Sequence, residues 1–316
     1  MPAALRRGTA LLALAGLALF LPIRFQVDVE FHERLMDAMH LPAFAALTLL
    51  LWDGLQRVAS WNAPTRGIAA GTGAGTLAGL VEIIQPFTGR MESLPDFCNA
   101  SAGAILAAAG CILWETRAGS AARCIHGAAA VGAILWTLGP AAREARALLW
   151  RETNFPILAD FESRNEEPLW QGPSRGDDGA SNTEWRRAAD AVSHGRNALR
   201  VRTAPGHHPG VRLLTGEQDW DGYGTLAFDV FNMGAPFTLA LRIDDDAPHG
   251  PGHQERYNGK IALGHGWTHA RIPLEEIARG PRYRFLRMHA IRRVIFFVNE
   301  PTQVHEFAID YPRLEK

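Results

Sequence analysis

Apolar and polar residues are distributed differently in the two halves of the chain. Apolar runs separated by short polar segments fill the first 140 residues and predict membrane spans at about 8–23, 38–52, 67–87, 97–114 and 125–140. Several of these runs are shorter than the roughly 20 residues that cross a bilayer, so flanking arginines must snorkel or the membrane must thin. Residues 24–36 are expected to form a charged loop. The first half is therefore predicted to be a bundle of five transmembrane helices.

The pattern changes after residue 140. Residues 141–156 predict a helical extension or an interfacial stalk, which ends at Asn154-Phe-Pro156. Beyond it the chain predicts strands at 157–161, 198–203, 211–214, 225–231, 237–243, 260–263, 269–272, 291–298 and 305–309. Short strands without a long helix are typical of an antiparallel jelly-roll sandwich. The expected domains are thus 1–140, 141–156 and 157–316, an all-α membrane bundle followed by an all-β sandwich.

Charge and cysteine usage agree with this division. Of the 65 charged residues, 21 precede Trp150 and 44 follow it. The net charge of −1 does not favour a nucleic-acid partner. None of the three cysteines follows residue 124, so the second half has no disulfide framework.

Arginines indicate the orientation in the membrane. With a cytoplasmic N-terminus, the inside segments carry six arginines and the outside segments three, which agrees with the positive-inside rule. The inside set is Arg6, Arg7, Arg57, Arg66, Arg117 and Arg123, and the outside set is Arg24, Arg34 and Arg90. Five spans then place the second half outside the cytoplasmic membrane, in the periplasm or its equivalent.

Polar residues stand at the ends of three predicted spans that this topology places in one leaflet. They are Asp37, His40, Glu82, Gln85, Asp96 and Asn99, with Arg90 in the loop above them. Such groups are costly among apolar helices unless they are paired, which makes them a candidate functional site. Ser93 and Asp96 have the spacing of a capping box, and the row Gly71, Gly75 and Gly79 predicts close helix packing.

This polar cluster allows two interpretations. In the first, Arg90 and His40 hold a phosphate or carboxylate of a lipid-linked envelope precursor, while Glu82 and Asp96 accept protons or balance charge. In the second, Glu82–Arg90 and Asp37–His40 are ion pairs that fix the bundle. No catalytic residue can be assigned from the sequence, and no nucleophile elbow or phosphate-binding loop is present.

The first 140 residues resemble the VanZ-like family of membrane proteins. The resemblance rests on Asp37-Ala-Met-His40, Glu82-Ile-Ile-Gln85, the Gly89-Arg90 turn and Asp96-Phe-Cys-Asn99 with Gly103. Leu41-Pro42 stands where such proteins usually have an aromatic residue. The resemblance implies a role in the cell envelope and in tolerance of glycopeptide antibiotics, without an agreed reaction.

Residues 157–316 resemble galactose-binding-like jelly rolls, which include many carbohydrate-binding modules. The resembling segments are Ala159-Asp-Phe-Glu162, Trp220-Asp-Gly-Tyr223, Gly266-Trp267 and Phe307-Ala-Ile-Asp310. The resemblance implies glycan binding, and it implies a calcium position near Glu162 and Asp310, where the first and last strands of such folds lie close. The sequence implies no cofactor, and a structural calcium ion in the β-domain is the one candidate.

Aromatic rings and planar polar groups are the usual sugar contacts, because an apolar pyranose face stacks on a ring. The candidate glycan-binding residues are Arg242, Asp244, Tyr257 and Asn299, with Tyr257 expected in a polar loop. Trp220 and Trp267 are expected to be structural. The acidic run Asp244–Asp246 is either a second calcium position or an ordinary acidic turn.

The sequence therefore predicts a multi-pass envelope protein and favours a binding protein over an enzyme. Its partners are expected to be the bilayer and a surface glycan or lipid-linked precursor. The alternatives are an intramembrane enzyme acting on such a lipid at Glu82, Arg90 and Asp96, and a scaffold for envelope assembly.

Overall fold

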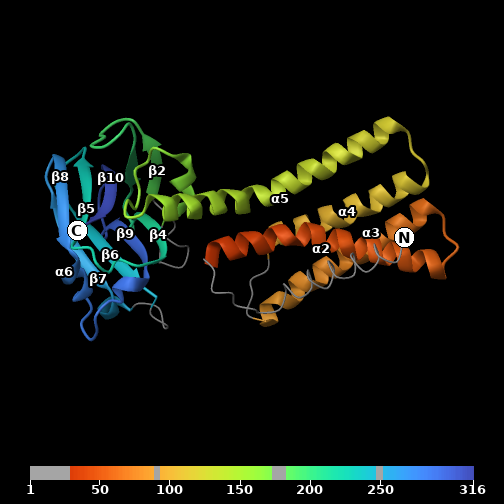
Figure 1. Cartoon of the computed structure of the whole chain (residues 1–316), viewed down its shortest axis with the longest axis horizontal. Helices are drawn as coiled ribbons and strands as arrows, with labels where there is room; N and C mark the ends of the chain where they lie inside the picture. The colour runs from red at the N-terminus through yellow and green to blue at the C-terminus, as the bar shows by residue number, and fades with distance from the viewer. Residues whose placement is uncertain (1–28, 89–92, 173–182, 247–251) are drawn as a thin grey trace. The chain divides into compact units, whose positions relative to one another are not determined.

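The structure, a computed structural model, describes residues 29–88, 93–172, 183–246 and 252–316. The chain divides into two compact units, Met1–Glu144 and Ala145–Lys316. The first is helical and the second is mostly β-sheet (Figure 1). The expected order, a helical region followed by an all-β region, is confirmed.

Four long helices are described, and all are long and apolar enough to cross a membrane. They are α2 (Val29–Val58), α3 (Ala63–Ile84), α4 (Leu94–Glu115) and α5 (Ser120–Asn154). They contain the second to fifth expected spans, whereas the first expected span and Arg6, Arg7 and Arg24 lie outside the described residues. A five-span bundle therefore stays a prediction.

One boundary of the expected helices is wrong. The charged loop expected up to residue 36 is helical from Val29, because glutamate, arginine, leucine and methionine all have high helix propensity. The helical extension that was one of the two expectations for 141–156 is found, since α5 continues through Pro140 as one helix to Asn154.

Small residues hold α3 and α4 together. Ala70, Ala74 and Ala78 of α3 are at most 2 % exposed and recur every fourth residue, which places them on one helix face. The expected glycine row contributes less than predicted: a Cβ at Gly71 would lie 3.2 Å from Ala108 Cβ, but one at Gly75 would meet nothing within 4 Å. Alanines one position before the glycines therefore form the contact face.

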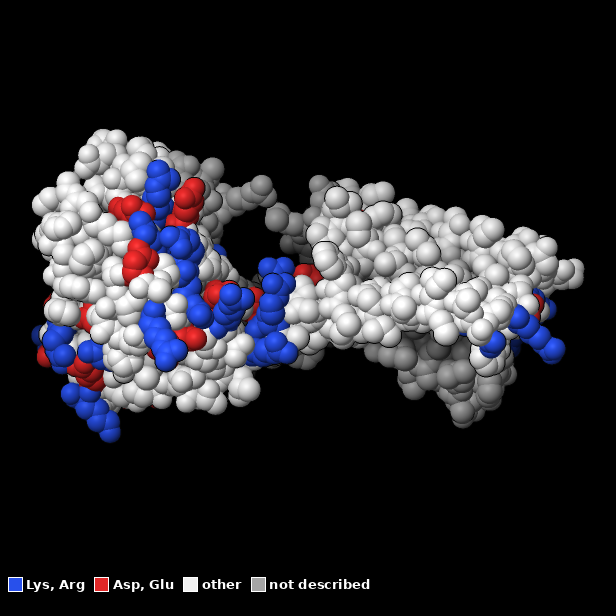
Figure 2. Space-filling model, turned by 90° about the horizontal axis from the view of Figure 1, so that it is seen from above, with Lys and Arg blue, Asp and Glu red and all other residues white. Residues whose placement is uncertain are grey.

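Large apolar side chains of the helices point away from the bundle. The most exposed include Ile68, Ile83, Ile105, Leu135 and Trp136, each more than 60 % exposed. Figure 2 shows few charged side chains along the helices on the face it presents, while Lys, Arg, Asp and Glu are spread over the β-unit. An apolar exterior with charges near the helix ends suits helices that cross a membrane.

The β-unit is a sandwich of two five-stranded antiparallel sheets (Figure 1). The first sheet has the order β1-β4-β9-β6-β7, and the second has the order β2-β3-β10-β5-β8. The strands are β1 (Trp170–Gln171), β2 (Thr183–Ala188), β3 (Ala198–Thr203), β4 (Gly210–Gln218), β5 (Thr225–Asn232), β6 (Phe237–Asp245), β7 (Tyr257–Leu263), β8 (Gly266–Pro273), β9 (Ile291–Val298) and β10 (His305–Glu315).

The inner faces of the two sheets form one hydrophobic core. Its largest fully buried side chains include Trp220, Phe228, Phe296 and Phe307. Eight expected strands are found. The strand expected at 157–161 is absent apart from a single bridge between Ile157 and Arg313, and Phe161 has a positive φ of 60° that extended chain does not adopt.

The sequence pattern did not reveal β1 and β2. β1 has only two residues, too few for any period to appear, and β2 carries three charged residues within six. A short α-helix, α6 (Leu274–Ala278), follows β8.

Candidate functional site

Two regions hold the residues that the sequence singled out, one at an end of the helical bundle and one on the first sheet. At the bundle end, α4 begins at Ser93, which is the predicted N-cap: its hydroxyl accepts the N–H of Asp96 at 3.3 Å. The other half of the expected capping box comes from a different helix. Glu82 Oε2 of α3 accepts the N–H of Ser93 at 2.8 Å. The end of α3 is thereby tied to the beginning of α4.

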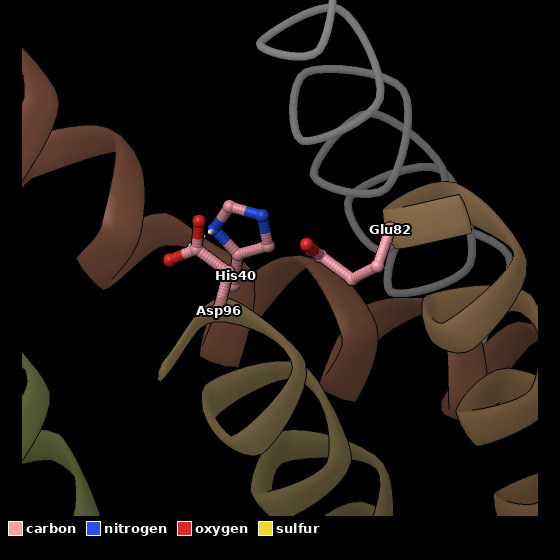
Figure 3. Close-up of side chains that lie close together, drawn as sticks. All are labelled: His40, Glu82 and Asp96. Atoms are coloured by element: carbon pink, nitrogen blue, oxygen red, sulfur yellow. Dashed lines mark ion pairs between the residues drawn. The ribbon is translucent and has the colours of Figure 1, made fainter. Parts of the chain in front are cut away.

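His40, Glu82 and Asp96 converge at this end of the bundle (Figure 3). One nitrogen or oxygen atom of each lies within 4.8 Å of the corresponding atoms of the other two. His40 Nδ1 lies 3.8 Å from Asp96 Oδ1. His40 and Asp96 are 7 % and 8 % exposed, respectively, and Glu82 is half-buried. Three helices, α2, α3 and α4, thus each supply one ionisable side chain to a single point.

The remaining members of the predicted polar cluster surround this point. Asp37 interacts electrostatically with Asp96 and, at 3.9 Å, with Arg34. Asn99 Nδ2 donates to the Asp37 backbone oxygen at 3.3 Å, which links α4 to α2. Gln85 is buried and begins the 3₁₀ turn η1 (Gln85–Thr88). Arg90 lies outside the described residues, so the predicted Glu82–Arg90 pair stays a prediction.

A cavity of about 1150 Å³ lies between α2, α4 and α5 in the helical unit. Its walls are mainly apolar and include Leu49, Trp52 and Leu106, while Glu115, Arg117 and His126 supply its polar groups. Glu115 pairs with the buried Arg66, whose guanidinium lies 4.8 Å from the Trp52 ring centroid. Glu115 ends the helix that begins beside the His40 cluster, so the two polar groups are at opposite ends of α4.

The outer face of the first sheet carries a row of planar polar side chains. Arg212 of β4 and Arg242 of β6 both pair in register with Ile295 of the intervening strand β9. Side chains directly opposite each other lie on one face. Gln171 of β1 pairs with Arg212 and accepts its Nε–H at 3.0 Å, and Asn258 of β7 pairs with Arg242. The row crosses all five strands.

Apolar side chains lie in the middle of this row. Ile295 and Phe297 are two residues apart on β9 and half-buried, whereas Phe296 between them lies in the core. A half-buried apolar strip between amides and guanidinium groups matches the amphipathic surface of a sugar ring. We call Gln171, Arg212, Arg242, Asn258, Ile295 and Phe297 the arginine face.

Asp244 holds Arg242 of this face and the neighbouring Arg293. It is fully buried, accepts the Nε–H of Arg242 at 2.8 Å and that of Arg293 at 2.6 Å. The neighbouring Asp245 accepts from Arg284 and Asp246 from Arg287. The acidic run 244–246 thus ends β6 and pairs with arginines. The second calcium position at this run stays a prediction.

One expectation about an aromatic residue is wrong. Tyr257 is 5 % exposed in β7, not in a polar loop, and its hydroxyl donates to Glu276 Oε1 at 2.7 Å. Burial is the largest of the causes that raise the Tyr257 pKa. Its enclosed ring offers no stacking face. Trp220 is fully buried as expected, and Trp267 is 38 % exposed and contacts the rings of Phe231 and His269.

The other predicted residues lie apart from the arginine face. Asn299 is exposed in the turn after β9. Glu162 Oε1 accepts the N–H groups of Arg196 and Asn197 at 2.7 and 2.8 Å, and the first of these bonds is the largest cause that lowers the Glu162 pKa. Asp310 Oδ2 accepts the N–H of His194 at 2.9 Å, and burial raises the Asp310 pKa. Both acids hold the segment 193–197, and calcium at these residues stays a prediction.

Sequence reasoning missed Gln171, Arg212, Asn258, Ile295 and Phe297. The alternation Arg293, Ile295, Phe297 was visible within one strand. The pairing of that strand with β4 and β6, which brings the arginines to its two sides, was not.

No protein-family model matches the chain, and no curated protein matches it. Among solved structures it is similar to a family 11 carbohydrate-binding module from Clostridium thermocellum in complex with a beta-1,3-1,4-mixed-linked tetrasaccharide. That match has 18 % identity, 50 % coverage of this chain, 94 % of the module and a TM-score of 0.40. The CBM22-1 xylan-binding domain from Paenibacillus barcinonensis has 13 % identity, coverage of 51 % and 95 %, and a TM-score of 0.35. An exo-beta-agarase has 14 % identity, coverage of 50 % and 24 %, and a TM-score of 0.39. The resemblance of the β-sandwich to carbohydrate-binding modules and that of the helical unit to VanZ-like proteins both stay predictions.

Proposed function

We propose that this protein is a membrane-anchored glycan-binding protein of the cell envelope, with the arginine face as its binding surface. The observation that carries the proposal is the register of Arg212, Ile295 and Arg242 across β4, β9 and β6. Guanidinium groups donate to sugar hydroxyls in fixed planar geometry. An apolar strip between two of them accepts the face of a pyranose.

Preorganisation supports this choice of surface. Asp244 accepts from Arg242, and Gln171 accepts from Arg212, so both guanidinium groups are held before a ligand arrives. Side chains that are already ordered lose less conformational entropy on binding. The Arg242 guanidinium has N–H donors beyond the Nε–H that Asp244 accepts, and in the proposal these serve a ligand.

The helical unit anchors this surface. In the proposed topology five spans cross the cytoplasmic membrane and the N-terminus is cytoplasmic, so the β-sandwich faces the envelope. The four described helices of sufficient length and apolarity support membrane insertion. Reporter fusions at residue 118 and at the C-terminus test the topology, since the proposal requires opposite sides for these two positions.

Glycan binding is tested with the full chain in detergent micelles on an array of cell-wall and surface polysaccharides. Arg212→Ala and Arg242→Ala are expected to weaken binding about tenfold or more, because hydrogen bonds to charged groups contribute about 1.5–3 kcal/mol each. Arg202→Ala on the second sheet, 51 % exposed, is the matched control and should bind normally. Equal binding by all three variants would refute the arginine face as the site.

A second candidate function concerns the helical unit. The convergence of His40, Glu82 and Asp96 from three helices favours an interaction with the polar headgroup of a lipid-linked precursor. This second candidate function includes an enzymatic alternative, in which Glu82 and Asp96 act as proton acceptors. Turnover of a polyprenyl-linked substrate by wild type, lost in Glu82→Gln, would establish the enzyme. Headgroup binding without turnover would establish recognition. Absence of both binding and turnover would favour an assembly scaffold.

A further inference from the structure

The His40, Glu82 and Asp96 side chains form a donor set that matches a metal site. One imidazole and two carboxylates supply nitrogen and oxygen ligands from α2, α3 and α4 (Figure 3). Ligands of a tetrahedral ion with bonds of about 2.1 Å lie about 3.4 Å apart. The donor atoms here lie within 4.8 Å of one another. Side-chain rotations that move them by about 1 Å bring them to bonding positions.

The histidine is held in the tautomer that a metal requires. Its Nδ1 lies 3.0 Å from the backbone oxygen of Met36, one helical turn earlier. A carbonyl oxygen can only accept, so Nδ1 carries the proton of this hydrogen bond. In the neutral ring Nε2 then holds a lone pair. Metal-binding histidines are commonly oriented by this kind of bond from their other nitrogen to a backbone carbonyl.

Asp96 is the group that most needs a cation. Its Oδ1 is buried and accepts no hydrogen bond, in a residue that is only 8 % exposed. A buried carboxylate oxygen without a donor is costly. The Asp37 carboxyl also interacts with the Asp96 side chain. His40 Nδ1, at 3.8 Å, is beyond hydrogen-bond distance of Asp96 Oδ1, so this oxygen is unsatisfied.

Glu82 completes the set without losing its structural role. Oε2 accepts the N–H of Ser93, and a carboxylate has two oxygens and about four acceptor positions. Metal-ligating carboxylates are in turn usually hydrogen-bonded to their surroundings. The bond to Ser93 therefore orients the carboxylate toward the point that His40 and Asp96 share.

We propose that His40, Glu82 and Asp96 bind one divalent transition-metal ion of the Zn²⁺ class. Imidazole selects Zn²⁺ and its neighbours over Mg²⁺ and Ca²⁺. Three protein ligands leave one position of a tetrahedral ion for water or a ligand oxygen, as in catalytic and substrate-binding zinc sites. The site goes beyond glycan binding by the β-sandwich and does not depend on it.

The test uses the full chain in detergent, purified with a tag other than polyhistidine and stripped with a chelator. Zn²⁺ binding is measured by equilibrium dialysis with elemental analysis, and Co²⁺ is added as a spectroscopic probe. We expect one equivalent of Zn²⁺ to bind, and Co²⁺ to give the intense visible absorption of a four-coordinate site. His40→Ala and Asp96→Asn should each weaken that site at least about tenfold.

Asp53→Asn is the control, because Asp53 is a buried acid of the same helix that pairs with Arg57 instead. It should retain the full equivalent of metal. Uptake that is the same in His40→Ala, Asp96→Asn and wild type would assign the metal to histidines of the β-unit and overturn the proposal. Absence of saturable uptake by wild type would also overturn it. If a variant misfolds, the Co²⁺ spectrum of wild type still decides, since octahedral oxygen-only coordination contradicts an imidazole site.

Discussion

Glu82 Oε2 accepts the backbone N–H of Ser93 at 2.8 Å, and this bond joins two consecutive helices of the bundle. Glu82 lies in the last turn of α3, where the helix dipole disfavours a negative charge. It also lies at the first residues of α4, where the dipole and the unpaired N–H groups favour one. The N-terminus of α4 therefore stabilises the charge of Glu82, whereas α3, the helix that contains Glu82, does not.

This relationship predicts a graded response to substitution at Glu82. Glu82→Ala removes the acceptor and should lower the free energy of unfolding by about 2 kcal/mol, whereas Glu82→Gln keeps a neutral acceptor and should cost about 1 kcal/mol. Thermal unfolding of the metal-stripped chain in detergent, followed by circular dichroism, measures both. Glu152→Ala, at a side chain that is 69 % exposed, should be close to neutral. Equal losses for the two Glu82 variants would contradict the role of the acceptor.

Gly103 determines how closely α4 approaches α2. A Cβ at this position would lie 2.1 Å from the backbone oxygen of Leu41, the residue after His40. Backbone cannot move aside as a side chain does, so Gly103→Ala must separate the two helices. We expect a loss of about 1–3 kcal/mol from overpacking, measured by thermal unfolding in detergent.

A matched glycine controls for helix propensity. Gly75 also lies inside a long helix, α3, but a Cβ there would meet nothing within 4 Å. Gly75→Ala should therefore be neutral or stabilise by up to about 1 kcal/mol. If Gly103→Ala were as well tolerated as Gly75→Ala, the close contact between α4 and α2 would not hold.

The sequence predicted the polar end of the bundle better than it predicted the sheet. N-cap chemistry is local, so Ser93 and Asp96 could be placed at the beginning of their helix from neighbouring residues alone. His40 was expected near the start of its helix but lies eleven residues inside α2. The bond from Glu82 to Ser93 was not predicted, because the capping-box pattern supplies its acceptor from within one helix.

The arginine face depends on pairing between strands that are distant in the chain. Arg212 and Arg242 meet on either side of Ile295 only because β9 inserts between β4 and β6. Alternation within a strand indicates which residues share a face, but it does not indicate which strands are neighbours. The prediction that Tyr257 lies in a polar loop was wrong for a related reason. Its neighbours in sequence are polar, but Gly259 and Gly280 leave room for its ring against the backbone.

Glu162 predicts a pH dependence of the β-unit. Hydrogen bonds from Arg196 and Asn197 lower its pKa below the usual 4.5. A lowered pKa in the folded state stabilises the fold above the unfolded pKa, and the stabilisation is lost as the pH falls through the folded pKa. Glu162→Gln should therefore lower the melting temperature at pH 7, and the difference from wild type should shrink below pH 4.5.

Melting curves of both proteins across this pH range measure the effect. Glu184→Gln, at a side chain that is 80 % exposed, is the control and should follow wild type at every pH. A difference for Glu162→Gln that stays constant from neutral to acidic pH would indicate lost packing instead of lost charge. Addition of Ca²⁺ to the same samples tests the predicted calcium position, since an ion held by Glu162 would raise the melting temperature of wild type and not of the variant.

Asp244 couples the stability of the β-unit to its proposed binding function. Its carboxylate is fully buried and accepts from both Arg242 and Arg293, so Asp244→Ala leaves two partly buried guanidinium groups without their acceptor. Removing one partner of a buried ion pair costs about 3 kcal/mol or more, and the loosened Arg242 should also bind glycan more weakly.

Asp190→Ala, at a carboxylate that is 47 % exposed and pairs with Arg200 on the second sheet, should cost at most about 1 kcal/mol and leave binding unchanged. Urea unfolding and glycan titration of the same preparations measure both quantities. Loss of stability with full glycan affinity would separate Asp244 from the binding site and place the ligand elsewhere on the sandwich.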